Sequence, residues 1–200
     1  RVTAVGPFIG ARKTLVFWQG EDDGYQRLGS KVRYRRAILR LPQDHWLVLD
    51  RLDSPSPHDY RLHWLLADHP FTSPKGGETL TLNTPAGSYH VMTGVVAGDA
   101  ARSLIRGAEG WPRGWRASGD QKKRPAISLV GRRQSACCCF WTLMGPHAAT
   151  VSTAEADCLT LNVCATNWNA EVLLAPEGQQ SIIERIQLDG DPTDRLVVSE

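Results

Sequence analysis

The feature that most constrains the fold is a recurring pattern of short apolar runs. These runs are separated by Gly, Pro, Asp, Asn and Ser, and no long segment has the periodicity of a helix. Short runs bounded by turn-forming residues are typical of antiparallel β-strands. A chain of 200 residues is long enough for one well-buried core and short for two. The sequence therefore predicts an all-β fold, a two-sheet antiparallel β-sandwich with many strands and no substantial helix, forming a single domain over residues 1–200.

The boundaries of the apolar runs give the expected strands. These are Val2–Phe8, Lys13–Gln19, Arg33–Leu41, His45–Asp53, Tyr60–Ala67, Glu78–Asn83, Ser88–Val95, Ala126–Gly131, Ala136–Met144, Thr150–Ala154, Cys158–Ala165, Trp168–Leu174, Ile182–Leu188 and Asp194–Val198. The segment Gly107–Pro125 holds four Gly, two Pro and two Trp without a clear period, so we expect a long loop there.

Charge and hydropathy limit the kinds of partner. The formal net charge is +2, which is too small to favour nucleic acid or an anionic membrane, and no apolar run approaches the length of a membrane span. We therefore expect no nucleic-acid partner and no membrane span. Because the chain begins with Arg1 rather than Met, we also expect it to be part of a longer protein.

The chain has five cysteines, of which Cys137, Cys138 and Cys139 are consecutive, with Cys158 and Cys164 further along. Consecutive side chains of a strand point to opposite faces, so these three cannot all bind one metal ion. One interpretation is that the cysteines are small buried hydrophobic residues. The alternative is one disulfide bridge or a thiol that reacts on oxidation. This cysteine usage is also compatible with the cytoplasm.

The best-defined segment is a meander over Arg33–Ala67. Its first predicted turn is Pro42–His45, and a pairing of Leu41 with Trp46 would place Ala37 opposite Asp50. Its second predicted turn is Ser54–Asp59, and a pairing of Asp53 with Tyr60 would place Asp50 opposite His63. In this register one face carries Asp50, His63 and Arg35 among apolar residues, and the other carries Tyr34, Arg36 and Trp64.

A buried carboxylate needs a partner, and three interpretations of Asp50 compete. Asp50 could form a structural ion pair with Arg35 or His63. It could instead be a zinc ligand together with His63, with further ligands drawn by residue type from the set His90, Asp22 and Asp23. Finally, Asp50 could orient His63 as a catalytic base, although the chain offers no clear nucleophile or substrate cleft.

One basic cluster stands out against the low net charge. Lys122, Lys123 and Arg124 are consecutive, and Arg132–Arg133 follows shortly after. The cluster is either a solvated loop or a contact for an acidic ligand such as a uronate or a sulfated glycan.

Several of these residues together resemble a known family. They are Gly20–Tyr25, Arg35–Arg36, Trp46–Leu52, His58–Tyr60 and His63, with weaker support from Gly114–Trp115 and Lys122–Ala126. The set, which covers roughly Val16–Val130, resembles the C-terminal β-sandwich of the heparinase II/III-like family.

The resemblance implies a polysaccharide lyase that cuts uronate-containing glycans by β-elimination. In that family an N-terminal helical toroid supplies most catalytic side chains, while the sandwich contributes a His and often holds a metal. The resemblance therefore implies a structural zinc at Asp50 and His63 as the metal ligands, and two partners, an acidic polysaccharide and a toroid of the same chain. It also implies a periplasmic or extracellular location.

Residue type suggests which side chains could contact a glycan, and this chain departs from the family pattern at several positions. The candidates for substrate binding are Arg36, Trp115, Lys122 and Arg124. Relatives often carry His at the positions of Asp22 and Tyr34, and a Tyr expected near Ser118 is missing. The catalytic set is incomplete, with Tyr34 and Asp22 its only candidates, so we expect the isolated domain to be inactive. The alternative is a non-catalytic module that binds acidic glycans or supports another domain.

Overall fold

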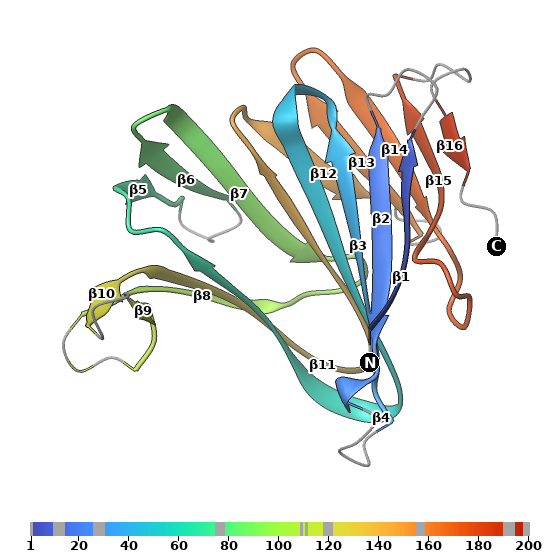
Figure 1. The fold of residues 1–200 in the computed structure, drawn as a ribbon, viewed down its shortest axis with the longest axis horizontal. Helices are drawn as coiled ribbons and strands as arrows, with labels where there is room; N and C mark the ends of the chain where they lie inside the picture. Colours follow the sequence, from blue (N-terminus) through green and yellow to red (C-terminus); the bar gives the residue numbers. More distant parts are fainter. Residues whose placement is uncertain are drawn as a thin grey trace.

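The computed structural model describes residues 2–9, 15–25, 31–74, 79–108, 110, 112–117, 122–154, 159–189 and 195–197. In these residues the regular structure is almost entirely antiparallel strand, with a short 3₁₀ turn at Pro42–Asp44 (Figure 1). The predicted all-β antiparallel fold is therefore confirmed. Within the same residues no helix has the length and apolar character needed to cross a membrane.

The larger sheet has the strand order β1-β2-β3-β4-β11-β7-β6-β5, and β8 pairs with the remaining part of β11. Its strands are β1 (Val2–Ile9), β2 (Val16–Asp22), β3 (Arg33–Leu41), β4 (His45–Leu66), β5 (Phe71–Thr72), β6 (Thr79–Thr84), β7 (Gly87–Val95), β8 (Ala101–Arg106) and β11 (Ile127–Gly145). Two short strands lie inside the segment predicted to be a loop, β9 (Trp115–Ala117) and β10 (Lys123–Pro125), and pair with each other.

The central strands β4 and β11 are each longer than predicted, because each joins two of the expected strands. The predicted turn at Ser54–Asp59 is wrong: β4 runs through it, and its pairing with β11 is interrupted between Asp53 and His58. The sequence between these two residues is Ser-Pro-Ser-Pro. Proline lacks the N–H that a ladder requires, so this segment forms an irregularity in a continuous strand instead of reversing the chain.

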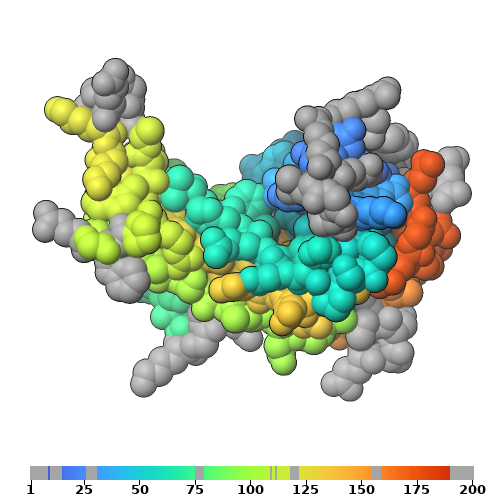
Figure 2. Space-filling model, turned by 90° about the horizontal axis from the view of Figure 1, so that it is seen from below, coloured from blue at the N-terminus to red at the C-terminus, as the bar shows by residue number. Residues whose placement is uncertain are grey.

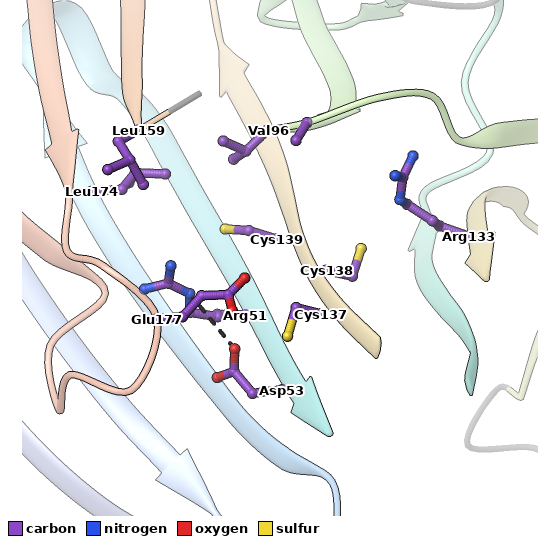
Figure 3. A pocket seen from close by; sticks show the side chains of 11 residues that line it. Arg51, Asp53, Val96, Arg133, Cys137, Cys138, Cys139, Leu159, Leu174 and Glu177 are labelled. Atoms are coloured by element: carbon purple, nitrogen blue, oxygen red, sulfur yellow. Dashed lines mark ion pairs between the residues drawn. The ribbon is translucent and has the colours of Figure 1, made fainter. Parts of the chain in front are cut away.

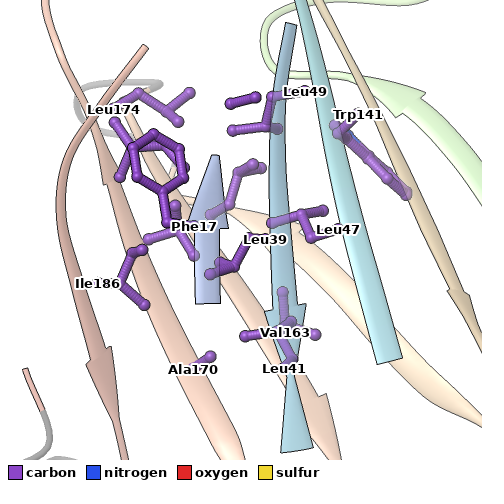
Figure 4. Packing of buried hydrophobic residues seen from close by; sticks show 14 of the residues in the cluster. Phe17, Leu39, Leu41, Leu47, Leu49, Trp141, Val163, Ala170, Leu174 and Ile186 are labelled. Atoms are coloured by element: carbon purple, nitrogen blue, oxygen red, sulfur yellow. The ribbon is translucent and has the colours of Figure 1, made fainter. Parts of the chain in front are cut away.

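The second sheet covers one face of the first. Its order is β12-β13-β14-β15-β16, with strands β12 (Ala149–Thr153), β13 (Thr160–Ala165), β14 (Asn169–Leu174), β15 (Ile183–Leu188) and β16 (Arg195–Val197). Buried side chains from both sheets form one cluster, in which Phe17, Leu39 and Leu47 meet Val163 and Ile186 (Figure 4). This shared core confirms the predicted two-layer sandwich.

The opposite face of the larger sheet curves around a second group of buried residues. Phe140 in β11 packs with Tyr60 and Leu62 from the far part of β4. A Cβ placed on Gly131 would lie 3.5 Å from the Phe140 ring, so two distant parts of β11 approach each other. The sheet therefore forms two arms, one with β2 and β3 and the other with β8, β9 and β10, and the surface between them is hollowed (Figure 2).

Candidate functional site

The candidate site lies on the curved face of the larger sheet, which points away from the sandwich core. Side chains alternate between faces along a strand, so Tyr34 and Arg36 of β3 share this face while Ala37 points into the core. The register pairs Arg36 with Asp50 and Ala37 with Leu49. The predicted pairing of Ala37 with Asp50 is therefore wrong by one residue, because β4 begins at His45, directly opposite Leu41.

Asp50 is the centre of a hydrogen-bonded group. Its side chain is almost fully buried, at 3 % exposure, and its Oδ1 accepts a hydrogen bond from the Tyr34 hydroxyl at 2.6 Å. Arg36 donates to both carboxylate oxygens, from Nε to Oδ1 at 2.7 Å and from Nη2 to Oδ2 at 3.0 Å. A bidentate arginine–carboxylate pair is among the stronger and more directional contacts in proteins. Asp50 does form an ion pair, but its partner is Arg36. The predicted partners Arg35 and His63 are wrong, because Arg35 pairs with Asp53 and His63 lies beside Ser128.

The protonation states in this group follow from its contacts. Burial, then the negative charge of Asp50 and the hydrogen bond to it, raise the pKa of the Tyr34 hydroxyl. Burial opposes the charge of Arg36, but its hydrogen bonds and attraction to Asp50 outweigh that effect and raise the pKa of the guanidinium. Tyr34 therefore remains a protonated hydrogen-bond donor and Arg36 remains a cation throughout the physiological range.

The guanidinium of Arg36 also lies on an aromatic ring from the far arm. Its Cζ is 5.3 Å from the centroid of Trp64, and the Trp64 indole N–H donates to the hydroxyl oxygen of Thr142 at 2.9 Å. Thr142 is completely buried in β11. The prediction that Tyr34, Arg36 and Trp64 share a face is correct. The contribution of Thr142 had no signal in the sequence, since it depends on how β4 curves.

Asp22 and Tyr25 complete the edge of the site. Asp22 is the cross-strand partner of Tyr34, and its Oδ1 accepts a hydrogen bond from the backbone N–H of Gly24 at 2.8 Å. The Tyr25 ring packs edge-on against Tyr34, with centroids 6.1 Å apart, and remains 46 % exposed. The structure thus brings Asp22, Tyr34, Arg36 and Asp50 together.

The predicted neighbourhood of Asp50 and His63 does not form. Both residues lie on the continuous strand β4, but His63 is the neighbour of Trp64, which shares the face of Asp50. Side chains alternate along a strand, so the His63 side chain points to the opposite face. Asp50 pairs with Phe140 of β11, whereas His63 pairs with Val130. Both oxygens of Asp50 are already bound, and the cationic Arg36 beside them disfavours a metal ion.

A zinc ion shared by these two residues therefore does not fit the site. More broadly, within the part of the chain that the structure describes, no group of three or more His, Cys, Asp or Glu side chains could hold a metal ion. His63 instead places Nε2 2.9 Å from the Ser128 hydroxyl. Partial burial, with the nearby charges of Arg113 and Arg61, lowers the pKa of His63.

The predicted basic contacts lie on the other arm. Trp115 in β9 stacks under Lys123, whose Nζ is 4.8 Å from the ring centroid. Arg124 follows Lys123 in β10, and Lys122 directly precedes the strand. Residues 101–125 contain seven Lys or Arg and two Asp or Glu, so this arm is far more basic than the chain as a whole. We call residues 101–125 the basic arm. Its strands β8, β9 and β10 lie across the hollow from β2 and β3 (Figures 1 and 2).

A separate cavity of about 240 Å³ opens at the end of the sandwich, beside the irregularity in β11. It is lined by charged, thiol and aliphatic side chains: Arg51, Asp53, Val96, Ala97, Arg133, Cys137, Cys138, Cys139, Leu159, Leu174 and Glu177 (Figure 3). Burial raises the pKa of Cys138 to about 12, so its thiol is a poor nucleophile.

The described cysteines are all free thiols, and Cys158 lies outside the described residues. Cys139 packs on the sandwich core and Cys138 on the opposite cluster, as the alternation of faces predicted.

Comparison with known structures finds the same fold in parts of larger proteins. The chain aligns with a solved heparinase III (10 % identity, TM-score 0.63) over 98 % of its own length and 27 % of that protein. It also aligns with the heparan sulfate lyase HepC from Pedobacter heparinus (14 % identity, TM-score 0.57) over 99 % of its length and 27 % of the relative. At these identities the likeness concerns the fold, and the chain spans about a quarter of the length of these relatives.

The fold is thus a β-sandwich of the kind found in heparinases. Residues 9–158 match the family described as heparinase II/III-like, C-terminal, and the chain belongs to that family. The resemblance seen in the sequence is therefore confirmed. No curated protein matches the sequence significantly.

Proposed function

We propose that this chain is the C-terminal β-sandwich of a polysaccharide lyase that acts on uronate-containing glycans, working with a helical domain of the same protein. The observation that carries the proposal is the fixed guanidinium of Arg36 on the curved face. Family membership and the basic arm across the hollow support the same ligand class.

Arg36 is suited to binding a carboxylate. Asp50 engages its Nε and Nη2, which leaves the N–H groups on the Nη1 side to form a second fork. Its side chain is 35 % exposed, so that fork can reach a ligand. In a β-elimination, a base removes the proton α to the uronate carboxylate, and negative charge accumulates on the carboxylate oxygens. A fixed cation at those oxygens stabilises the charge where it develops.

Tyr34 and Asp22 have supporting roles in this proposal. The Tyr34 hydroxyl donates to Asp50, and its raised pKa makes it unsuited to removing a proton. Asp22 lies beside it, where relatives often carry an imidazole, and carboxylates as a class are far weaker bases than imidazoles. The base would therefore come from the helical domain, and the sandwich would bind and orient the uronate. On this reasoning the sandwich alone is inactive.

Substitution of Arg36 tests the proposal. In the full-length protein, Arg36→Ala should reduce kcat/KM on uronate polymers by about 100-fold, because a charge-stabilising contact is lost. The rate is measured from the absorbance of the new carbon–carbon double bond. Arg185→Ala, which removes an arginine paired with Glu171 on the second sheet, is the matched control and should retain activity. A full-length protein that cleaves no uronate polymer would refute the lyase proposal.

A second candidate function is a non-catalytic module that binds acidic glycans. The high positive charge of the basic arm favours it, and among the described residues the side-chain hydrogen bonds of Tyr34 and Arg36 go to Asp50 and not to an imidazole. In this case Trp115 would contact a sugar ring and the neighbouring cations would contact its acidic groups.

The basic arm can be tested by binding. The double substitution Lys122→Ala with Arg124→Ala should weaken binding to an acidic oligosaccharide by several-fold at low salt, and by less as the salt concentration rises. Isothermal titration at two ionic strengths measures the effect, again with Arg185→Ala as control. Equal affinities of the double variant and the wild type would exclude this arm from glycan binding.

A further inference from the structure

We infer that Trp64 and Thr142 are positioning residues that fix the orientation of Arg36, and that they do so by linking the two arms of the curved sheet. This inference adds two residues to the proposed uronate site, and its biological meaning rests on the proposed function. Trp64 touches the binding arginine and Thr142 acts through Trp64, and neither is assigned a direct contact with substrate.

The first observation is that Arg36 is fixed by a contact on its edge and another on its plane. Asp50 fixes the edge through two hydrogen bonds, while the Trp64 ring lies 5.3 Å below the guanidinium carbon. With Asp50 as its only partner, the guanidinium plane of Arg36 could still tilt about the edge that carries the two hydrogen bonds. The ring restricts that swing, because a guanidinium prefers to lie flat on an aromatic face.

The second observation is that Trp64 is itself held in place. Its indole N–H donates to Thr142, a residue with no exposed surface in the strand next to β4. The indole ring has one hydrogen-bond donor, its N–H, and no acceptor. This bond therefore sets which edge of the ring points into the sheet. Removing the hydroxyl would leave a half-buried N–H without its partner, which favours a different ring orientation.

The third observation is that this chain of contacts spans the two arms. Arg36 and Thr142 belong to the part of the sheet that covers the sandwich core, since their strand neighbours Ala37 and Leu143 lie in that core. Trp64 lies on the other arm, beyond the Ser-Pro-Ser-Pro segment of β4. The orientation of Arg36 therefore depends on how closely the two arms approach each other.

The experiment measures hydrogen exchange of the Arg36 Nε proton by ¹⁵N NMR, with the signal identified by its loss in Arg36→Lys. Thr142→Val keeps the shape of the side chain but removes the hydroxyl, and it should accelerate exchange by about tenfold. Trp64→Phe, which removes the N–H, should act similarly, and the double variant should be no faster than either single one. Thr142→Ser keeps the hydroxyl and should exchange like the wild type.

Thr150→Val on the second sheet is the matched control and should also exchange like the wild type. Unchanged exchange in Thr142→Val would overturn the inference, as would equal acceleration by Thr150→Val. Affinity for a uronate oligosaccharide is measured on the same variants and should fall in Thr142→Val but not in Thr142→Ser. If the wild type binds no uronate, the proposed function fails, while the exchange result still decides the positioning role.

Discussion

Replacing Asp50 with Ala should destabilise the protein by about 3 kcal/mol. The substitution removes the acceptor of three hydrogen bonds at once and leaves the Arg36 cation and the Tyr34 hydroxyl half-buried without their partner. The expected value is at the lower end of the range for broken buried ion pairs, because one third of the Arg36 side chain is exposed. Urea unfolding followed by tryptophan fluorescence measures the change.

The control for this prediction is another Asp–Arg pair in the same hairpin. Asp44 binds Arg40 at 2.6 Å, but both side chains are largely exposed, at 69 % and 48 %. Asp44→Ala should therefore change the free energy of unfolding by no more than about 0.5 kcal/mol. If the two variants lost equal stability, Asp50 would not be the structural centre of the site.

Replacing Phe140 with Ala should destabilise the protein by about 3–5 kcal/mol. Phe140 is 2 % exposed and fills the inside of the curve, where it packs with Tyr60 and Leu62 and rests against Gly131. Gly131 has no side chain that could move into the space, which limits how far the cavity can collapse. Differential scanning calorimetry should show a clear fall in the melting temperature.

Leu65→Ala is the comparison for Phe140→Ala. Leu65 is also a large apolar residue of the central strands, but it is 47 % exposed. Its replacement should change the free energy of unfolding by no more than about 0.5 kcal/mol. If Phe140→Ala had a similarly small effect, the second buried cluster would not be what keeps the two arms together.

Most of the fold was predictable because alternation and turn composition act locally. The strand at Arg33–Leu41 was predicted with its observed bounds, and most of the later strands agree within two residues. The strand predictions fail where the same local sequence is compatible with two structures. Ser-Pro-Ser-Pro is rich in turn-forming residues, yet here the pairing of β4 with β11 continues on both sides of it. Pairing with the distant strand β11 determines whether this segment reverses the chain or forms an irregularity within one strand. A single sequence does not reveal that pairing.

The candidate site was predictable in part. Tyr34 and Arg36 share a face by simple alternation, and the need of Asp50 for a partner was clear from its apolar neighbours. The partner was misassigned because a shift of one residue at the start of β4 exchanges Ala37 for Arg36 opposite Asp50. Asp50 and His63 were paired only through a turn that does not exist. The contact between Trp64 and Thr142 depends on how strongly β4 curves, and no repeating pattern in the sequence indicates that curvature.

The segment between Asp53 and His58 limits which insertions and deletions this protein can accept there. Even-numbered residues of β4, such as Asp50 and Trp64, face the hollow on both sides of that segment. Adding or deleting one residue there would reverse the parity of everything beyond it, turning Trp64 outward and His63 inward. Insertions and deletions in this segment are therefore compatible with the site only in even numbers.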